Sequence, residues 1–546
     1  MNLINRLIAW RFKLPPAETH RISHERNLQI PMPDGAVLLA DRYYPTQGGK
    51  LPTLLVRSPY GRAGFPLEVF FYAFAERGFQ VLVQSCRGTF GSGGKFYPFH
   101  EDRNDGLATI TWLRQQEWYS GAFAIFGPSY LSYVQWAVAD QAGPELKALV
   151  PIVTTAEFRT VTYPGETFAL DTILSWAQGI TFQEDPPFKL FLLRLRRALQ
   201  LRKAYAHLPL NETDKLASGT DVAFYQDWLA HNAPGDSYWQ QSDHSARVSQ
   251  VTAPVLLIGG FYDVLFPHTL ACYLSLRQAG YNPYLTIGPW THVAPGMQPV
   301  MTNETLKWMR THLLNDSSGL RQLPVRICVM GTNEWKEFEA WPPTGYLPQH
   351  WHLQANGNLS TSIPSESAPD QYRYDPADPT PSVGGSSLTP NAGARDNRKL
   401  ETRSDVLLYT TPLLEHDLEV VGPLRAELYV KSSLQHTDFF VRLCDVFPSG
   451  KSINLSDGIV RLVPGRFSPA GDKVSKIEVE LWPTANCFQK GHRIRVQVSS
   501  GAHPRFARNP GSGEPLASAT KLIPADQQVF HDPAHPSAII LPVKGL

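Results

Sequence analysis

The residues best suited to chemistry in this sequence are a serine, an aspartate and a histidine that occur in that order along the chain. Ser129 lies in the run AIFGPSY, Asp263 in the run GGFYD and His292 in the run GPWTH. A serine hydroxyl is a weak nucleophile that needs a histidine as general base, and the histidine needs a carboxylate that fixes its tautomer. Together these three groups could attack the carbonyl carbon of an ester or an amide.

Each of the three residues follows a predicted buried strand. The apolar runs 122–126, 253–260 and 284–288 end just before Ser129, Asp263 and His292. Open α/β sheets place their sites at the carboxyl ends of parallel strands, so we expect the three side chains to converge. Serine, acid, histidine is also the chain order of α/β-hydrolases.

The segment around Ser129 predicts a sharp strand-to-helix turn that exposes the hydroxyl, with helix amides beside it for a developing oxyanion. The strict Gly-x-Ser-x-Gly pattern is not met, because Leu131 stands at the second glycine position. Taken singly, Ser129 could merely cap a helix, Asp263 could cap the next one, and His292 could be a buried hydrogen-bonded histidine. Their shared order and position at strand ends favour a catalytic triad.

The elements that must position these residues alternate between strand-like and helix-like segments from residue 27 to 153. This alternation predicts a parallel sheet covered by helices. The predicted strands are 37–44, 53–57, 79–86, 122–126 and 146–153, and the predicted helices are 68–77, 104–116 and 129–140. The pattern resumes with strands at 253–260 and 284–288 and a helix at 302–314.

Two regions interrupt or follow this pattern. Between residues 155 and 253, aromatic and helix-like segments broken by Pro164, Pro186 and Pro187 predict an inserted helical cap. From about residue 345, short alternating strands at 424–430, 439–446, 477–482 and 493–498 predict an all-β sandwich or jelly roll. Residues 355–400 lack periodicity, and we expect a long surface excursion there.

The predicted fold class is therefore α/β, an α/β-hydrolase fold with an inserted helical cap and a C-terminal jelly-roll (galactose-binding-like) domain. We expect the α/β-hydrolase domain at 1–155 and 246–345, the cap at 156–245 and the jelly roll at 346–546.

Composition excludes several other classes of function. The net charge of +1 over 546 residues gives no electrostatic reason to expect a nucleic acid partner, and no membrane contact is expected. Five scattered cysteines without a Cys-x-x-Cys pair favour a reducing, cytoplasmic location, and no metal or other cofactor is predicted. The glycine-rich run 88–94 lacks the Lys-Ser/Thr ending of a phosphate-binding loop. The basic amphipathic segment 188–203 is interpreted as a cap helix with a solvated face.

The N-terminal segment 1–15 is too interrupted by charge for a signal peptide. Its apolar residues share one helical face, which predicts a helix docked on the protein's own body, with attachment to a surface as the alternative. The chain contains no apolar run of 18 residues, so no spanning helix is expected.

Motifs along almost the whole chain resemble the cocaine esterase and X-Pro dipeptidyl-peptidase family of serine hydrolases. The resemblance is carried by the runs DRYYP, RSPY, QSCRG, GPSY, GGFYD, GPWTH, VMGTNEW with WPP, DVLLYTT, TDFFVRLCDVFPSG and PRFARNP. One departure is Ser132, where the family elbow commonly has glycine; its hydroxyl adds a group that needs a partner.

The resemblance implies further site residues. A tyrosine hydroxyl is expected to join the amide after the nucleophile in holding the oxyanion, which maps to Tyr43 and the amide of Tyr130. Trp176 in the cap and Leu265 after the acid fall where the family places the wall of the acyl pocket. Each of these would otherwise be read as a core residue.

The expected activity is hydrolysis of an ester or amide of a small acyl substrate through a Ser-His-Asp triad and an acyl-enzyme. An X-Pro dipeptidyl peptidase or an α-amino-acid ester hydrolase is the alternative, and each needs acidic groups to hold a free amine. The residues after Asp263 are Val, Leu and Phe, which favours neutral acyl esters. A non-catalytic binding protein is the alternative from another class. The sequence leaves a homodimer open.

Overall fold

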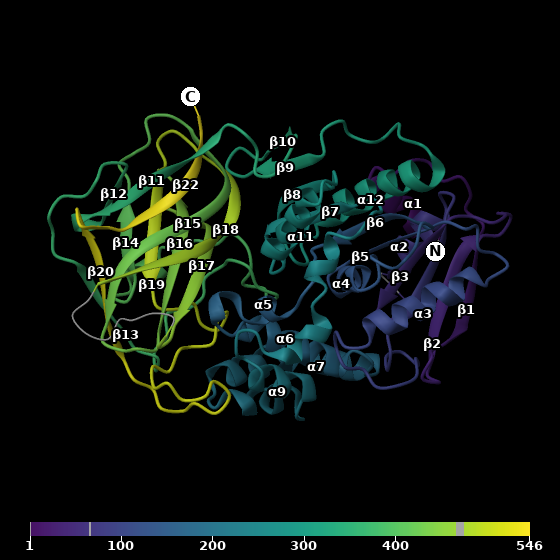
Figure 1. The fold of residues 1–546 in the computed structure, drawn as a ribbon, viewed down its shortest axis with the longest axis horizontal. Coiled ribbons are helices and arrows are strands. Elements are labelled where there is room, and N and C mark those ends of the chain that lie inside the picture. The colour runs from purple at the N-terminus through teal and green to yellow at the C-terminus, as the bar shows by residue number, and fades with distance from the viewer. Residues whose placement is uncertain (1, 65–66, 466–473, 546) are drawn as a thin grey trace. The chain divides into compact units, whose positions relative to one another are not determined.

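The computed structural model describes residues 2–64, 67–465 and 474–545 (Figure 1). The chain forms two compact units. The first contains residues 1–158, 237–259 and 268–325, and the second contains residues 159–236, 260–267 and 326–546. None of the helices in the described ranges is both long and apolar enough to span a bilayer.

The first unit is built on a mostly parallel sheet whose strands alternate with helices along the chain. Its strands run in the order β1-β2-β4-β3-β5-β6-β7-β8. Strands β3, β4, β5 and β6 pair in parallel, whereas β1 and β2 pair antiparallel with each other and β2 pairs antiparallel with β4. The bounds are β1 Ile22–Pro31, β2 Val37–Pro45, β3 Thr53–Ser58, β4 Gln80–Ser85, β5 Phe123–Pro128, β6 Leu146–Ile152, β7 Leu256–Tyr262 and β8 Tyr284–Thr291.

The helices of this unit include counterparts of those predicted at 68–77, 104–116, 129–140 and 302–314. They are α1 Asn2–Arg11, α2 Leu67–Ala75, α3 Asp102–Arg114, α4 Tyr130–Trp136, η3 Ser237–Ser242, α10 Ser245–Val248, α11 Phe266–Gln278 and α12 Met297–Leu314. Strands β3 and β4 are buried along their whole length, which is why they read as continuous apolar runs. The α/β fold class predicted from the alternation is confirmed.

A buried histidine in this unit makes stability depend on pH. His244 at the start of α10 hydrogen-bonds the Tyr133 hydroxyl at 3.1 Å, and burial, with Arg247 and Arg103, lowers its pKa to about 4. The unfolded state takes up a proton near pH 6.5, so the contribution of His244 is present above that pH and is lost as pH falls towards 4. Its full size is about 3 kcal/mol.

We expect the free energy of unfolding, measured by denaturant titration, to fall between pH 7 and pH 4. In His244→Asn that fall should be smaller by up to about 3 kcal/mol. Burial also lowers the pKa of His503 to about 4, so part of the pH dependence of the free energy of unfolding should remain in His244→Asn. An unchanged slope in His244→Asn would contradict the assignment.

The second unit contains the inserted helices and all the C-terminal strands. The helices are α5 Arg159–Thr162, η1 Pro164–Glu166, α6 Leu170–Phe182, α7 Pro187–Ala206, η2 Leu210–Glu212, α8 Thr213–Ser218, α9 Ala223–Ala230, η4 Ala355–Gly357 and η5 Leu400–Thr402. The strands are β9 Val325–Val329, β10 Glu334–Phe338, β11 Tyr346–Gln354, β12 Asn358–Ser360, β13 Asp370–Tyr374, β14 Leu407–Thr410, β15 Leu418–Ser432, β16 Thr437–Val446, β17 Ser452–Leu462, β18 Ser475–Phe488, β19 Arg493–Ser499, β20 Ala525–Asp532, β21 His535–Pro536 and β22 Ala538–Lys544.

The C-terminal region is all-β, as predicted. Its main path runs β13-β20-β15-β22-β11-β12-β14-β19-β16-β17, with β18 paired to β15 and β21 to β20. Residues alternate between buried and exposed along β15 and β18, so each strand has one face in the core. Strand β16 is buried throughout.

Most of the helical insert, residues 159–236, belongs to the same compact unit as this β domain. The Asp171 amide of α6 donates to the Pro504 carbonyl at 3.0 Å, and the Ser387 hydroxyl donates to the Asp171 carboxylate at 2.6 Å. The Ala507 amide donates to the Phe168 carbonyl at 2.8 Å. Burial raises the pKa of Asp171, and the hydrogen bonds that its carboxylate accepts from the Ser387 and Thr172 hydroxyls make it tolerable there.

One glycine in this unit is required by close backbone packing. Gly165 in η1 has φ +56°, and a Cβ there would lie 1.8 Å from the carbonyl oxygen of Ile459 on β17. We expect Gly165→Ala to lower the free energy of unfolding by about 3 kcal/mol, from backbone strain plus the forced shift.

Gly219 in the same insert is the matched control for Gly165, because it has φ +77° but no atom within 4 Å of its Cβ position. Gly219→Ala should cost only the strain, about 1 kcal/mol. Equal losses in the two variants, measured by urea unfolding, would contradict the packing role of Gly165.

The segment 355–400, which the sequence suggested is a surface excursion, is partly packed into the β domain, although many of its residues are exposed. Thr380 and Asn397 are buried, and the Arg442 guanidinium on β16 donates to the Val383 carbonyl at 2.6 Å and to Asn397 Oδ1 at 2.7 Å. Irregular backbone can be buried when its polar groups find partners, and here a buried arginine supplies them. Such pairing leaves no periodic pattern in the sequence.

Candidate active site

Ser129 occupies the sharp corner between β5 and α4. Its backbone has φ 60° and ψ −124°, a combination that non-glycine residues rarely adopt. Two residues earlier, Gly127 has φ +149°, and a Cβ there would meet the Leu131 Cβ at 2.5 Å. A glycine at 127 therefore lets the chain turn tightly, although Leu131 replaces the second glycine of the usual pattern.

Hydrogen bonds hold this strained corner in place. The Ser129 amide donates to the Ile152 carbonyl of β6 at 2.9 Å. Its carbonyl accepts from the amides of Ser132 and Tyr133 at 2.8 and 3.1 Å and from the Ser132 hydroxyl at 2.5 Å. The Ser132 hydroxyl, where a glycine was expected, thus finds its partner on the nucleophile's own carbonyl.

His292 comes directly after β8, and its ring lies on the serine. The distance between His292 Nε2 and Ser129 Oγ is 2.9 Å. This is the distance at which an imidazole can take the hydroxyl proton. Both residues belong to the first unit, and the sequence prediction that the two would meet at strand ends is matched by this geometry.

Tyr130 is the first residue of α4, a position at which a helix amide has no acceptor within its own helix. Its side chain points into the core: the hydroxyl donates to the Asp102 carboxylate at 2.6 Å and accepts from the Phe99 amide at 3.0 Å. Burial raises the pKa of both the Tyr130 phenol and the Asp102 carboxyl. The ring therefore anchors the corner.

Asp263 follows the end of β7, the strand next to β8. Its side chain is buried, and one carboxylate oxygen accepts from the Leu265 amide at 2.7 Å. The residue therefore lies where the strand order predicts an acid.

Tyr43 lies far from Ser129, contrary to its expected role as oxyanion donor. Strand β2 is antiparallel, so Tyr43 pairs with Val81 of β4, which is level with Leu54 of β3 and Ala124 of β5. Ala124 precedes the nucleophile by five residues, about 16 Å along a strand, and β2 is three strands away from β5.

The Tyr43 hydroxyl is also already engaged. It donates to the Arg62 carbonyl at 3.1 Å, with Glu68 at 3.4 Å, and its buried ring stacks on His24 at 4.1 Å between centroids. Burial, with Glu68 nearby, raises the pKa of this phenol. Tyr43 is therefore a core residue, and the reading of the sequence without the family resemblance was correct at this position.

The sequence interpretation missed Tyr60. It lies two residues beyond β3, and β3 pairs directly and in parallel with β5, so the loop starts at the same edge of the sheet as Ser129. Tyr60 is partly exposed, and its amide donates to the Ser58 hydroxyl at 3.0 Å. The motif RSPY at a strand end was the available signal, since α/β-hydrolases take their second oxyanion donor from the loop after this strand.

The two residues expected to line the acyl pocket both lie in the second unit. Trp176 on α6 stacks on Trp228 at 6.0 Å and meets Phe224 at 5.6 Å, and Leu265 is buried. Their roles as pocket residues stay predictions.

No cluster of three or more metal-ligating side chains occurs within the described ranges. All five cysteines are buried and unpaired as disulfides.

A strained serine at a strand-to-helix corner, with a histidine within proton-transfer distance in a mainly parallel sheet, defines a serine hydrolase of the α/β-hydrolase fold. The comparisons with known proteins agree. The sequence profile of the X-Pro dipeptidyl-peptidase (S15) family matches residues 34–294, and that of its C-terminal non-catalytic domain matches residues 320–540. The chain belongs to the cocaine esterase and X-Pro dipeptidyl-peptidase family, and it is an ester hydrolase or a dipeptidyl-peptidase-type serine hydrolase.

Individual relatives span nearly the whole chain. Cocaine esterase of Rhodococcus sp. (strain MB1 Bresler) is 32% identical over 569 residues, covering 95% of this chain and 98% of that protein. An aminopeptidase from a marine sediment Thaumarchaeota archaeon has a TM-score of 0.82 at 22% identity, covering 97% of each chain. An α-amino-acid ester hydrolase has a TM-score of 0.80 at 21% identity, covering 97% of this chain and 98% of its own. At these identities the two structures support the fold alone.

Proposed function

We propose that the protein hydrolyses carboxylic esters of small acyl groups through a covalent acyl-enzyme. The observation that carries this proposal is the 2.9 Å contact between His292 Nε2 and Ser129 Oγ. His292 takes the hydroxyl proton while Ser129 Oγ bonds to the carbonyl carbon. The tetrahedral intermediate then expels the alcohol, which receives that proton from His292.

The second half of the reaction uses the same groups. His292 removes a proton from water, the resulting hydroxide attacks the acyl carbon, and Ser129 Oγ leaves with the proton. Asp263 is proposed to orient the imidazole and to stabilise its protonated form. This role rests on its place directly after β7, the neighbour of β8, and on its burial. No cofactor is required.

The oxyanion is proposed to be held by the amide of Tyr130 and the hydroxyl of Tyr60. The Tyr130 amide is the first of α4, and Tyr60 replaces Tyr43 because its loop begins beside the nucleophile strand. Two fixed donors act only as negative charge develops, which lowers the barrier without tightening substrate binding.

A matched pair of variants tests the proposal that Tyr60, and not Tyr43, donates to the oxyanion. Tyr60→Phe should lower kcat by about 10²-fold, because one oxyanion donor is lost, with little change in KM. Tyr43→Phe should leave kcat within a few-fold and instead lower the melting temperature, because a buried hydrogen bond is lost. Steady-state kinetics on p-nitrophenyl butyrate and thermal unfolding measure both. A large kcat loss in Tyr43→Phe with none in Tyr60→Phe would restore the original assignment.

The acyl group is proposed to be neutral. No acid occurs among the three residues after Asp263, whereas a peptidase or amino-acid ester hydrolase must hold a free α-amine. A relative whose name is cocaine esterase supports an ester over a peptide as substrate. The second candidate, hydrolysis of α-amino-acid esters or dipeptides, is favoured only by the names of relatives.

The test compares paired substrates that differ only in the amine. The p-nitrophenyl ester of N-acetyl-alanine should have a higher kcat/KM than that of alanine, and alanyl-prolyl p-nitroanilide should be a poor substrate. A kcat/KM that is higher for the free amine would assign the second candidate. Labelling by a fluorophosphonate without turnover of either ester would leave a serine hydrolase that acts on amides.

We propose a reducing compartment, in the first instance the cytoplasm. All five cysteines are free and none forms a disulfide, which is the pattern of proteins in a reducing environment. Recovery of the protein in an oxidising, extracytoplasmic fraction of the cell would contradict this location.

A further inference from the structure

Helix α1 exposes two large apolar side chains and buries a polar one, which a helix that serves only the protein's own core would not do. Leu7 and Trp10 are 63% and 75% exposed. Asn5, in contrast, is only 4% exposed, and neither atom of its amide group has a hydrogen-bond partner. Burying an amide without hydrogen-bond partners lowers the stability of the fold, and two large apolar side chains left in water contribute no stabilisation by burial. The docked position of α1 is therefore not explained by folding alone.

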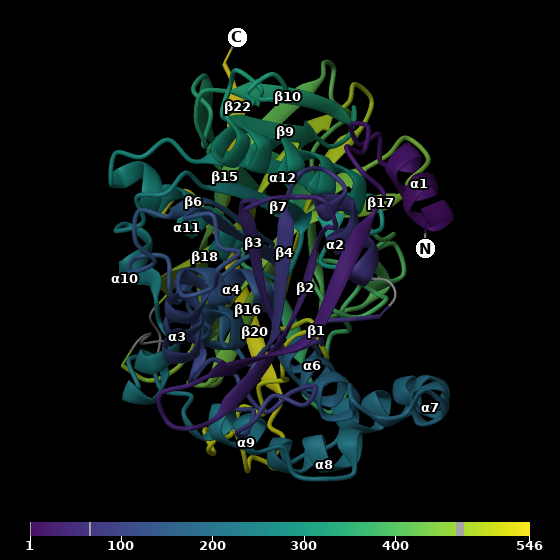
Figure 2. The same ribbon diagram turned by 90° about the vertical axis from the view of Figure 1, so that its right-hand side faces the viewer.

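The helix is nevertheless fixed at its carboxyl end. The Phe12 ring meets Phe70 of α2 at 6.5 Å, and the Asn303 side chain of α12 donates to the carbonyls of Phe12 and Lys13. The Arg77 guanidinium donates to the Pro15 carbonyl at 2.9 Å. Figure 2 shows α1, in dark purple, lying beside α2 at the outer side of the sheet. A rigid support thus presents Leu7 and Trp10 outward.

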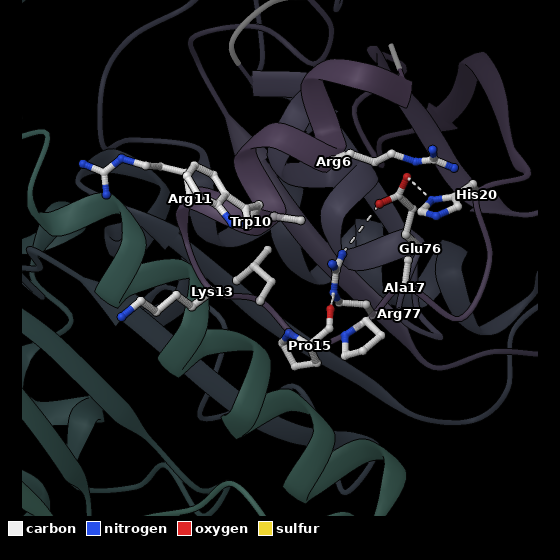
Figure 3. A pocket seen from close by; sticks show the side chains of 12 residues that line it. Arg6, Trp10, Arg11, Lys13, Pro15, Ala17, His20, Glu76 and Arg77 are labelled. Carbon is white, nitrogen blue, oxygen red and sulfur yellow. Dashed lines mark hydrogen bonds and ion pairs between the residues drawn. The ribbon is translucent and has the colours of Figure 1, made fainter.

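Beside Trp10 lies a groove of about 600 Å³ with a basic lining. Figure 3 shows Arg6 on one side of it, with His20 and Glu76, and Arg11 and Lys13 on the other. Arg6, Arg11 and Lys13 are exposed, and no ion pair involves them within the part of the chain that the structure describes.

The carboxylates near this groove are neutralised by other cations. Glu76 pairs with His20 at 3.2 Å and with Arg77 at 3.6 Å, and Glu18 pairs with Arg310 at 3.0 Å. Residues 1–17 contain no Asp or Glu. The surface around Leu7 and Trp10 is therefore positive, while the whole chain carries a net charge of only +1.

We propose that α1 docks the enzyme on an anionic phospholipid surface. Leu7 and Trp10 enter the headgroup region with the helix lying in the plane of the interface, and Arg6, Arg11 and Lys13 meet the lipid phosphates, with the groove beside Trp10 receiving a headgroup. A tryptophan is suited to this position because its ring is apolar and its N–H is polar. An exposed apolar pair flanked by cations is the pattern of interfacial helices.

The proposal can be tested by co-sedimentation of the full chain with vesicles. Vesicles of phosphatidylcholine with 30% phosphatidylglycerol should bind at least about tenfold more protein than phosphatidylcholine alone. Binding should weaken by about tenfold in Leu7→Ser/Trp10→Ser and in Arg6→Gln/Arg11→Gln/Lys13→Gln, because each variant removes one of the two attractions. Failure of the wild type to prefer anionic vesicles would overturn the proposal.

Matched controls come from the β domain. Ile363→Ser removes an apolar side chain that is 70% exposed, and Lys451→Gln/Lys490→Gln/Lys521→Gln removes the same number of exposed charges. Both should bind vesicles as the wild type does, and all four variants should keep ester hydrolysis in solution.

A different binding site or a different ligand of the α1 surface would give different results in these experiments. Binding that survives in both α1 variants would overturn the proposal and point to α7, whose Phe188 and Leu199 are also exposed. A wild-type dimer that dissociates in Leu7→Ser/Trp10→Ser, without vesicle binding, would overturn it in favour of a second copy of the chain. Displacement from vesicles by millimolar inorganic phosphate at matched ionic strength would show a site for free phosphate and overturn docking on lipid.

Discussion

Replacing Ser129 with alanine should lower kcat for p-nitrophenyl esters by at least about 10⁴-fold, with the fold and melting temperature unchanged. The loss is large because the reaction has no covalent route without the hydroxyl that His292 contacts at 2.9 Å. Alanine carries a Cβ as serine does and occupies the same corner at φ 60°, so the backbone strain and the stability should stay as they are. Labelling by a fluorophosphonate should vanish with the activity.

Ser132→Ala is the matched control, because it removes the same atom one turn along α4. The Ser132 hydroxyl bonds the Ser129 carbonyl, so its loss should weaken the corner and lower kcat by less than about tenfold. Ester hydrolysis that survives in Ser129→Ala would show that the reaction does not depend on Ser129 as nucleophile. A loss in Ser132→Ala as large as in Ser129→Ala would show that the geometry of the corner, and not the Ser129 hydroxyl alone, sets the rate.

Replacing Asp263 with asparagine should lower kcat near pH 7 by about 10³- to 10⁴-fold. The amide cannot stabilise a protonated imidazole and favours the tautomer of His292 that cannot accept the serine proton. Substrate binding should change little, so KM should stay within a few-fold. Steady-state kinetics from pH 6 to pH 10 measure the effect.

Folding must be separated from catalysis in this variant, because Asp263 is buried and also accepts from the Leu265 amide. An asparagine side-chain oxygen can keep that hydrogen bond, so the melting temperature should fall by only a few degrees. A folded Asp263→Asn enzyme with wild-type kcat would remove Asp263 from the mechanism, and the acid would then have to be sought elsewhere.

The sequence by itself determined the class of fold and the order of the candidate catalytic residues. Continuous apolar runs identify buried strands, and Ser129 and His292 each follow such a run, because the end of a parallel strand is a local property of the chain. The all-β character of the C-terminal region was equally readable, because strands such as β15 and β18 alternate between core and solvent.

Only the tertiary structure showed that Tyr43 lies away from Ser129. Tyr43 and Tyr60 both stand in family motifs, but β2 is antiparallel, which carries Tyr43 to the level of Ala124, whereas the loop of Tyr60 starts at the edge that holds Ser129. Strand direction and register depend on pairing between distant segments, so the residue types alone could not separate the two.

The same reason applies to the remaining differences. The buried position of Asn397 is satisfied by Arg442, and the helical insert contacts the β domain where Gly165 meets Ile459 and where Asp171 meets Ser387. The outward face of α1 follows from how it packs on α2, not from its own pattern. Each of these outcomes is set by partners far away in the chain, which periodicity and motifs do not encode.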